Sequence, residues 1–561
     1  MKTIFLPLAI VYTVALLGQA PLPIAATHYG LDSSRMMLLI QANESALTKA
    51  ENGLVTPDDF YLFLDLDTSL LYDSSYQVSG VNGDTFTVSF TPLPLVKITS
   101  DGSINRYNRR PSVLTYARDE EVLTSPVGVR YRGGFSLRFP KKSIDLEFYE
   151  TSANENTRDV SFGDMRSDDD WVIDALYNEP SRVNAYVAHK LWLDLHQLSY
   201  ADEEPEAKAG ADLEFVELWL NGKYQGLCTL GEQVDRKLLK LKKLKDDEVR
   251  GLLFKSEDYT DATSLKAVPA DRIKGDKWAG WEVKHPEPDE VEWEELKDFI
   301  RFSGSATNSE FQQEAARRID LANVIDYLLF VNALSLTDNV SKNTFLGRYD
   351  ESSPFFFVPW DMDAGIGTNH EGKRYSSFDH FSENFLFRRL REQYPDDFTD
   401  QLCDRYENLR EGLLHPDSLI ARVTNAMATL EESGAFRREA ARWPATLNSS
   451  SEQLDFMASV LRARIDKLDS YVCSLPTSIG KPDGQVATAL KIFPNPAGSY
   501  VTISLPAGDN DATYILFGST GQAVRSGAVR GEHQDISLDG LATGLYYLRV
   551  GKRVARLTVA R

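Results

Sequence analysis

Cysteine is scarce in this chain, which has only Cys228, Cys403 and Cys473 among its 561 residues. No pair has the Cys-x-x-Cys spacing of a zinc or redox site, so the sequence excludes such sites. So few cysteines in a chain of this length indicate stability from core burial rather than from many cross-links. One disulfide with one thiol left over remains an option, and three buried free cysteines are the favoured interpretation.

Positive charge is also in deficit, with 61 Lys and Arg against 83 Asp and Glu and a formal net charge of −22. An excess of negative charge of this size argues against nucleic acid or an anionic membrane surface as a partner. The length predicts about three domains. A hydrophobic content of 42% is enough for substantial cores.

Long apolar runs are missing after the first twenty residues. Met1-Lys-Thr precedes an apolar run from Ile4 to Leu17, and Gly18-Gln-Ala20 follows it. This pattern predicts a signal peptide over residues 1–20, because the run is too short to span a bilayer as a mature helix. We therefore expect an exported chain without a transmembrane segment in its mature form.

Acidic and amide side chains, by contrast, gather between Asp338 and Asp363. Two strands flank the turn 350–354, and this hairpin places Asn343 opposite Asp361. Asp338, Asn343, Asp361 and Asp363 then meet at one end, where a cation is needed to offset the repulsion of the acids. Oxygen ligands of this kind favour Mg²⁺ or Mn²⁺. Simple turn and cap preferences, or a calcium loop at Asp361–Gly365, are the alternatives.

The spacing Asp-x-x-x-x-Asn, followed by an aspartate at the end of a strand, is also that of a protein-kinase catalytic loop. In this interpretation Asp338 is the base that accepts the proton of the attacking hydroxyl. Asn343 and one of Asp361 and Asp363 hold the metal on the phosphates. The spacing alone does not separate Asp361 from Asp363.

Candidate nucleotide contacts lie earlier in the chain. After Pro140, alternation places Lys142 on the apolar face of a strand, where ATP phosphates would compensate its charge, and Lys141 is a second candidate. Arg132 with the two following glycines could bring backbone close to phosphates. Glu232 is a candidate for a nucleotide or lysine contact. The alternatives are a lysine at the strand edge, a glycine bend, and a glutamate at a helix N-terminus.

Four segments, in order along the chain, resemble the CotH family of kinase-like proteins over roughly residues 92 to 470. They are Val127-Gly-Val-Arg-Tyr-Arg-Gly-Gly-Phe-Ser136, Pro140-Lys-Lys-Ser143, Glu217-Leu-Trp-Leu-Asn-Gly-Lys-Tyr-Gln-Gly226 and Trp360-Asp-Met-Asp-Ala-Gly-Ile-Gly367. The resemblance implies ATP and Mg²⁺ (or Mn²⁺) as cofactors and transfer of phosphate to Ser or Thr of a surface or secreted protein. A non-catalytic surface or adhesin protein with the same fold is the alternative, since fold does not determine function.

The last part of the chain changes to short alternating strands punctuated by Gly, Pro, Asn and Asp. Phe493-Pro-Asn-Pro496 and Gly544-Leu-Tyr-Tyr-Leu-Arg549 resemble the C-terminal sorting domain of the type IX secretion system. This implies handling by that machinery, followed by release or anchoring at the outer cell surface. A carbohydrate-binding sandwich is the competing interpretation.

Together these patterns predict an α+β protein with five parts. A two-lobed, protein-kinase-like core has a strand-rich first lobe and a helical second lobe, and an all-β, immunoglobulin-like sandwich ends the chain. The parts are the signal peptide (1–20), a β-rich segment without assigned chemistry (28–91), the CotH-like domain (92–472), a linker (473–486) and the sandwich (487–561).

Overall fold

The computed structural model describes residues 21–66, 69–153, 156–245, 248–291, 293–393, 397–474, 490–504, 511–518, 523–531, 533–550 and 553–560. Contacts divide the chain into two compact units, Met1–Gln393 with Arg405–Asp469, and Tyr394–Asp404 with Ser470–Arg561. The predicted signal peptide, and residues 475–486 of the predicted linker, lie outside the described residues. Within the described ranges, no helix has the length and apolarity needed to cross a bilayer.

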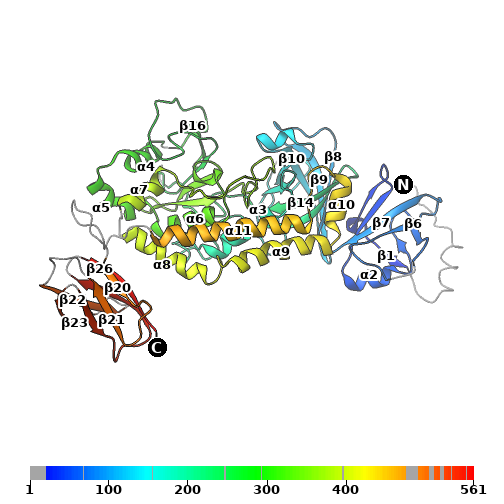
Figure 1. Ribbon diagram of the computed structural model, residues 1–561. Helices are drawn as coiled ribbons and strands as arrows, with labels where there is room; N and C mark the ends of the chain where they lie inside the picture. The colour runs from blue at the N-terminus through cyan, green and yellow to red at the C-terminus, as the bar shows by residue number, and fades with distance from the viewer. Residues whose placement is uncertain are drawn as a thin grey trace. The chain divides into compact units, whose positions relative to one another are not determined.

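The first unit begins with a seven-stranded sheet in the order β1-β4-β5-β6-β7-β3-β2, drawn in blue in Figure 1. Its elements are β1 (Leu22–Pro23), η2 (Ala26–His28), β2 (Tyr29–Asp32), β3 (Met37–Gln41), α2 (Glu44–Ala50), β4 (Leu54–Val55), β5 (Phe60–Phe63), β6 (Ser75–Ser79) and β7 (Thr85–Thr91). Apolar residues of the strands and of α2 share one core. The segment therefore has its own buried interior.

A closed seven-stranded barrel follows, in the order β10-β11-β12-β14-β13-β8-β9. The strands are β8 (Leu95–Ser100), β9 (Arg110–Arg118), β10 (Glu121–Tyr131), β11 (Ile144–Phe148), β12 (Asp170–Asp174), β13 (Leu213–Leu220) and β14 (Lys223–Gly231). Ile144, Leu146 and Phe148 lie in the barrel core, as the alternation predicts. Asn221 and Gly222 both have positive φ, 49° and 69°, which suits a tight turn between β13 and β14.

A five-stranded sheet and most of the helices make up the rest of the first unit; residues 398–404, 470 and 471 of two helices and the last 3₁₀ turn belong to the second unit. The sheet order is β16-β17-β15-β18-β19. Its strands are β15 (Leu252–Ser256), β16 (Lys277–Trp278), β17 (Trp281–His285), β18 (Thr344–Arg348) and β19 (Phe355–Pro359). The helices are α3 (Asn184–Leu195), α4 (Trp293–Ser305), α5 (Asn308–Arg318), α6 (Leu321–Ala333), α7 (Phe385–Gln393), α8 (Phe398–Arg410), α9 (Pro416–Glu432), α10 (Ala435–Arg442) and α11 (Ser451–Tyr471), with 3₁₀ turns η3 (Phe135–Arg138), η4 (Asp338–Val340) and η6 (Val472–Ser474).

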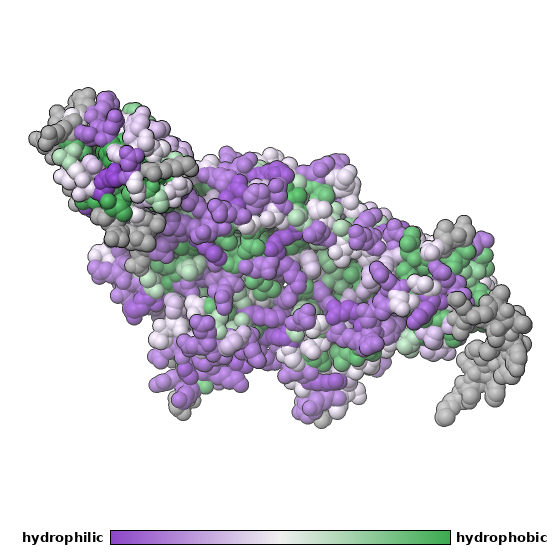
Figure 2. Space-filling view, turned by 90° about the horizontal axis from the view of Figure 1, so that it is seen from below, coloured by the Kyte–Doolittle hydropathy of each residue, from purple (hydrophilic) through white to green (hydrophobic). Residues whose placement is uncertain are grey.

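Helix α6 carries the chain to the catalytic-loop candidate, and it is buried along almost its whole length. Asp320 caps it by accepting a hydrogen bond from the Asn323 backbone N–H at 3.0 Å. This cap separates α5 from α6, so that two helices occupy this part of the chain. Hydrophilic residues cover most of the face drawn in Figure 2, with smaller hydrophobic areas between them.

The second unit is all-β from residue 490 onward within its described ranges. One sheet has the order β20-β21-β24 and the other β23-β22-β25-β26. The strands are β20 (Lys491–Phe493), β21 (Tyr500–Ser504), β22 (Asp511–Gly518), β23 (Ala523–Arg530), β24 (His533–Ser537), β25 (Gly544–Val550) and β26 (Arg553–Val559). Both sheets contribute to one hydrophobic core, which makes a β-sandwich.

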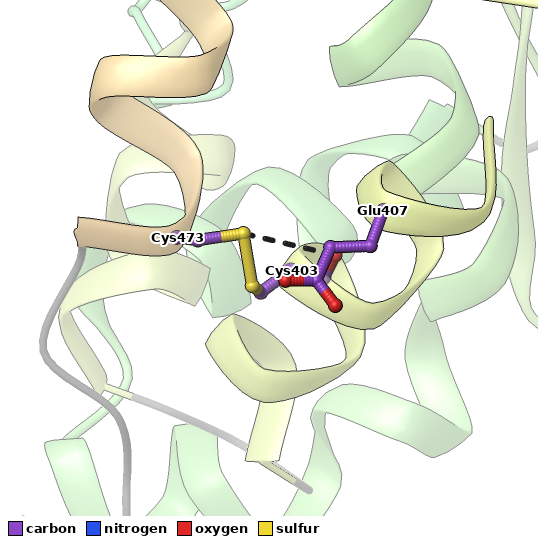
Figure 3. A group of neighbouring side chains, drawn as sticks. All are labelled: Cys403, Glu407 and Cys473. Carbon is purple, nitrogen blue, oxygen red and sulfur yellow. Dashed lines mark hydrogen bonds between the residues drawn. A yellow bond between two sulfur atoms is a disulfide. The ribbon is translucent and has the colours of Figure 1, made fainter. Parts of the chain in front are cut away.

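The favoured expectation of three free cysteines is wrong. Cys403 on α8 and Cys473 in η6 form a disulfide, with Glu407 one helical turn along α8 (Figure 3). Cys228 is free and buried in the barrel, and burial raises the pKa of its thiol to about 12. The pairing joins residues 70 positions apart, which spacing in the sequence does not indicate.

Candidate functional site

The β18–β19 hairpin forms the base of the site. Thr344 pairs with Pro359, and one step further the Trp360 backbone N–H donates to the Asn343 carbonyl at 3.0 Å. Asn343 is therefore opposite Trp360 and not opposite Asp361, one residue away from the expected register. The ladder ends there because Asn343 and Asp361 have φ values of 54° and 55°, which turn the backbone out of the extended region.

Asn339 holds the Asp338 loop against this open end of the hairpin. Its buried side-chain amide donates to the carbonyls of Asn343 and Trp360, both at 2.8 Å. The Tyr327 hydroxyl of α6 donates to the Asn339 carbonyl at 2.7 Å. The backbone of the Asp338 loop is thus held beside Asn343 and Trp360 at the open end of the hairpin.

Asp338 is half-buried in η4 and has an aromatic neighbour. Partial desolvation, followed by the nearby Asp338 carboxylate, raises the pKa of Tyr259. Tyr259 itself is 54% exposed. One side of the loop is therefore accessible to a partner molecule.

A small pocket opens between the hairpin end and the barrel. Its lining includes Arg132, Asp174, His189, Trp360, Asp361 and Asp363. About 40 Å³ of the pocket is accessible to water, which suits a few waters or a hydrated ion rather than a whole nucleotide.

The acids of the pocket raise one another's pKa. For Asp363, withdrawal from bulk water and then the charge of Asp361 raise the pKa far above its ordinary value, although Asn178 donates a hydrogen bond to its carboxylate. For Asp361, the same withdrawal and the charge of Asp174 raise the pKa, although part of the residue is exposed. Its carboxylate has no hydrogen bond or salt bridge within the described part of the chain.

Asp361 and Asp363 offer oxygen ligands that suit a hard divalent cation, and among the described residues no third acid forms a group with both of them within 4.8 Å. Crowded carboxylates with raised pKa values, one of them lacking a partner, are stabilised when an ion takes up their charge. The side-chain amide of Asn343 likewise makes no hydrogen bond among the described residues, so its oxygen is available as a further ligand. Mg²⁺ or Mn²⁺ would be held by the two aspartates, whereas Asn343 is not among the residues that line the pocket.

The sequence interpretation assigned neither Asp174, which lines the pocket, nor Glu179 to the metal site. Asp174 ends β12 and accepts a hydrogen bond from Ser143 Oγ at 3.0 Å. Glu179 caps α3, accepting from the Asn184 backbone N–H at 2.7 Å, and burial followed by the Asp174 charge raises its pKa to about 8. A strand that ends in an aspartate is the signal that also marks Asp361, but only the fold brings the two strand ends together.

The two candidate lysines face other partners. Lys141 is buried and donates to the Glu439 carboxylate of α10 at 2.9 and 3.0 Å. Lys142 precedes β11 and donates to the carbonyls of Leu137, at 2.6 Å, and Phe139. Neither amine lies among the lining residues of the pocket.

Arg132 and Glu232 do line the pocket. The Arg132 guanidinium lies over the Trp360 ring, 5.4 Å from its centroid. Glu232 accepts from Lys208 Nζ at 2.7 Å and from the backbone N–H groups of Arg166 and Asp212, both at 2.8 Å. Described turns, not a helix, follow Glu232, so it caps no helix there.

Acid is expected to destabilise the fold through His189, which is buried behind the pocket. Burial lowers its pKa to about 4; the Ala211 carbonyl, Asp212 and Asp174 oppose the shift and Lys190 adds to it. Neutral His189 makes its full contribution to the free energy of unfolding above pH 6.5. This contribution, about 3 kcal/mol in total, is lost as the pH falls toward 4.

Denaturant unfolding of the parent and of His189→Gln at pH 7 and pH 4.5 measures this term. The difference between the two proteins isolates His189 from the other acids that titrate in the same interval. Equal loss of stability in both proteins would show that His189 does not carry the effect.

The family model described as CotH kinase protein matches residues 129–468. The chain belongs to the CotH family. The match includes all the candidate residues around the pocket, and it confirms the resemblance of the four sequence segments. The description assigned to residues 491–559 is Secretion system C-terminal sorting domain, which confirms export by type IX secretion, to the cell surface or beyond it.

Two curated relatives are similar to parts of this CotH-family chain. Inner spore coat protein H of Bacillus subtilis is 25% identical over 248 residues, which are 44% of this chain and 61% of the relative. Beta-agarase A of Zobellia galactanivorans is 30% identical over 102 residues, 18% of this chain and 19% of that protein. The chain thus spans about three fifths of the first relative's length and a fifth of the second's.

Proposed function

We propose that this chain is an exported, Mg²⁺-dependent protein kinase that transfers the γ-phosphate of ATP to Ser or Thr of a surface or secreted protein. The observation that carries the proposal is the pocket at the hairpin end, which is lined by Asp174, Asp361 and Asp363. The barrel and the helical region would serve as the two lobes of a kinase-like core.

The candidate site residues would divide the chemical steps among them. Asp338 would accept the proton of the acceptor hydroxyl, directly or through one water. Asp361 and Asp363 would hold the divalent cation, with Asp174 and Asn343 as further ligands; the bound ion would neutralise charge on the phosphates. Arg132 would contact phosphate. Lys141, Lys142 and Glu232 would need a change of partner to reach a nucleotide.

Incubation of the full chain with labelled ATP, Mg²⁺ or Mn²⁺ and candidate acceptor proteins tests the proposal. We expect label on Ser or Thr, dependent on the divalent ion and at least about a hundredfold lower in Asp361→Ala. Failure of the parent chain to bind ATP at any divalent-ion concentration would instead favour a non-catalytic surface or adhesin protein with this fold.

A further inference from the structure

A second, larger groove lies beside the acid pocket and is lined in part by Asn178. Most of its lining residues belong to three segments that are far apart in the chain. These are residues 177–180 between β12 and α3, residues 371–374 between β19 and α7, and residues 445–453, which lead from α10 into α11. The groove has a volume of about 430 Å³ accessible to water, against about 40 Å³ for the acid pocket. It therefore has room for a few residues of a bound molecule.

One wall of the groove contacts a metal-ligand candidate. The Asn178 side-chain amide donates to the Asp363 carboxylate and, at 3.0 Å, to the His370 carbonyl. Asn178 thus belongs to the groove and also touches an acid of the pocket. The groove and the acid pocket are separated at this point by a single side chain.

Another wall leads to the candidate base. Arg374 lines the groove, and the hydroxyl of the next residue, Tyr375, forms a hydrogen bond with the Thr337 hydroxyl at 3.4 Å. Thr337 directly precedes Asp338. A molecule in the groove would therefore lie near both Asp363 and the Asp338 loop.

Buried groups fix the spacing of these walls. The Arg182 guanidinium has no exposed surface and donates to Thr446 Oγ1 at 2.7 Å and to the Tyr177 carbonyl at 3.2 Å. The Asn448 backbone N–H donates to the Pro180 carbonyl at 2.7 Å. The segments before α3 and before α11 are thus joined directly, and the groove is part of the fold.

Several hydrogen-bond donors in the groove are not used by the protein. Gln453 is only 2% exposed, and its Oε1 accepts from Arg374 Nη2 at 2.8 Å. Because arginine can only donate, this contact fixes the orientation of the amide. Within the described ranges, the Gln453 Nε2 group, the Asn448 Nδ2 group and the Leu447 backbone N–H donate no hydrogen bond. Buried polar groups ordinarily have a partner, so these donors suit the acceptor atoms of a ligand.

The groove also has an aromatic wall. Phe139 and Tyr177 both line it, with ring centroids 5.3 Å apart, and the Trp443 ring supports Tyr177 edge-on at 5.6 Å. The charged residues are paired, since Arg374 donates to Glu452 at 3.3 Å. Glu371 likewise pairs with Lys373 at 2.6 Å. Unused donors beside an aromatic face suit a polypeptide, which carries one carbonyl acceptor per residue, better than a polyanion.

We propose that this groove binds an extended segment of the acceptor protein, next to the Ser or Thr that receives phosphate. Carbonyls of the segment would accept from Gln453 Nε2 and from the Leu447 backbone N–H, and an apolar side chain would pack on the Tyr177 ring. The inference rests on the proposed function, because it places the segment relative to phosphate transfer. It adds that residues flanking the acceptor hydroxyl determine which proteins are substrates.

A library of ten-residue peptides, each with a central serine and random flanking residues, tests this inference with the full chain, labelled ATP and Mg²⁺. Gln453→Glu keeps the acceptor for Arg374 and removes the Nε2 donor, and Tyr177→Leu removes the aromatic wall. Each should raise the KM for peptides about tenfold and leave the Kd of Mg-ATP within about twofold. Tyr177→Leu should also weaken the preference for apolar residues beside the serine.

Gln313→Glu is the matched control, because this exposed glutamine lies on α5 outside the groove. If the parent labels peptides and both groove variants keep the KM and the flanking preference of Gln313→Glu, this inference alone is overturned. Equal losses of peptide and Mg-ATP affinity would overturn it too, since the variants would then act through Asn178 on the acids. A parent chain that labels no peptide removes the proposed function, and this inference with it.

Discussion

Replacing Asp338 with asparagine should lower the rate of phosphoryl transfer by about a hundred- to ten-thousandfold, the range for loss of a general base. Asparagine keeps the size of the side chain and cannot take up the acceptor's proton. Affinity for Mg-ATP should stay within about twofold, because Asp338 lies in η4 and the ion would be held by the residues after β19. Single-turnover transfer and nucleotide titration, measured on the same preparations, separate the two effects.

Asp298→Asn is the matched control, since this exposed aspartate pairs with Arg318 at 2.6 Å outside the pocket. It should transfer phosphate at the parent rate. An Asp338→Asn protein that transfers at the parent rate would remove Asp338 from the mechanism. Equal losses of transfer and of nucleotide affinity would place it among the binding residues instead.

Replacing Glu439 with glutamine should lower the free energy of unfolding by about 3–5 kcal/mol, the usual cost of breaking a buried ion pair from one side. Glu439 has no exposed surface and accepts from Lys141 Nζ, from Arg182 Nε at 3.0 Å and from the Leu227 backbone N–H at 2.9 Å. Glutamine leaves two buried cations without a counter-charge. Gly226, with φ of +100°, makes room for this carboxylate, because a Cβ there would collide with it.

The same change should loosen the acid cluster. Arg182 donates to the carbonyls of Tyr177, at 3.2 Å, and Glu179, so it holds the segment whose Asn178 contacts Asp363. Chemical unfolding followed by tryptophan fluorescence measures the stability. Glu432→Gln, an exposed glutamate at the end of α9, should change it by less than about 0.5 kcal/mol. A loss below about 1 kcal/mol in Glu439→Gln would show that the two cations find other partners.

Local sequence patterns predict the hairpin that forms the base of the site. Turn formers at 350–354 between two apolar runs indicate the β18–β19 hairpin, and the acids at its ends follow from their positions in the chain. The one-residue error in register arose because the loop includes Tyr349 as well, which alternation alone does not reveal. Strand alternation does not determine where the Lys142 side chain lies, because β11 begins only at Ile144. The role assigned to Lys142 stays a prediction.

By itself, the sequence determined the family, the sorting domain and the hairpin that joins Asp338 to Asp361, because each depends on neighbours in the chain or on recognisable motifs. Only the tertiary structure decided which distant charges meet. Asp174 reaches the pocket through closure of the barrel, and Glu439 reaches Lys141 across 298 residues. Such contacts form because buried charges need partners. Tertiary packing, and not the separation of the residues in the sequence, determines which partner each charge meets.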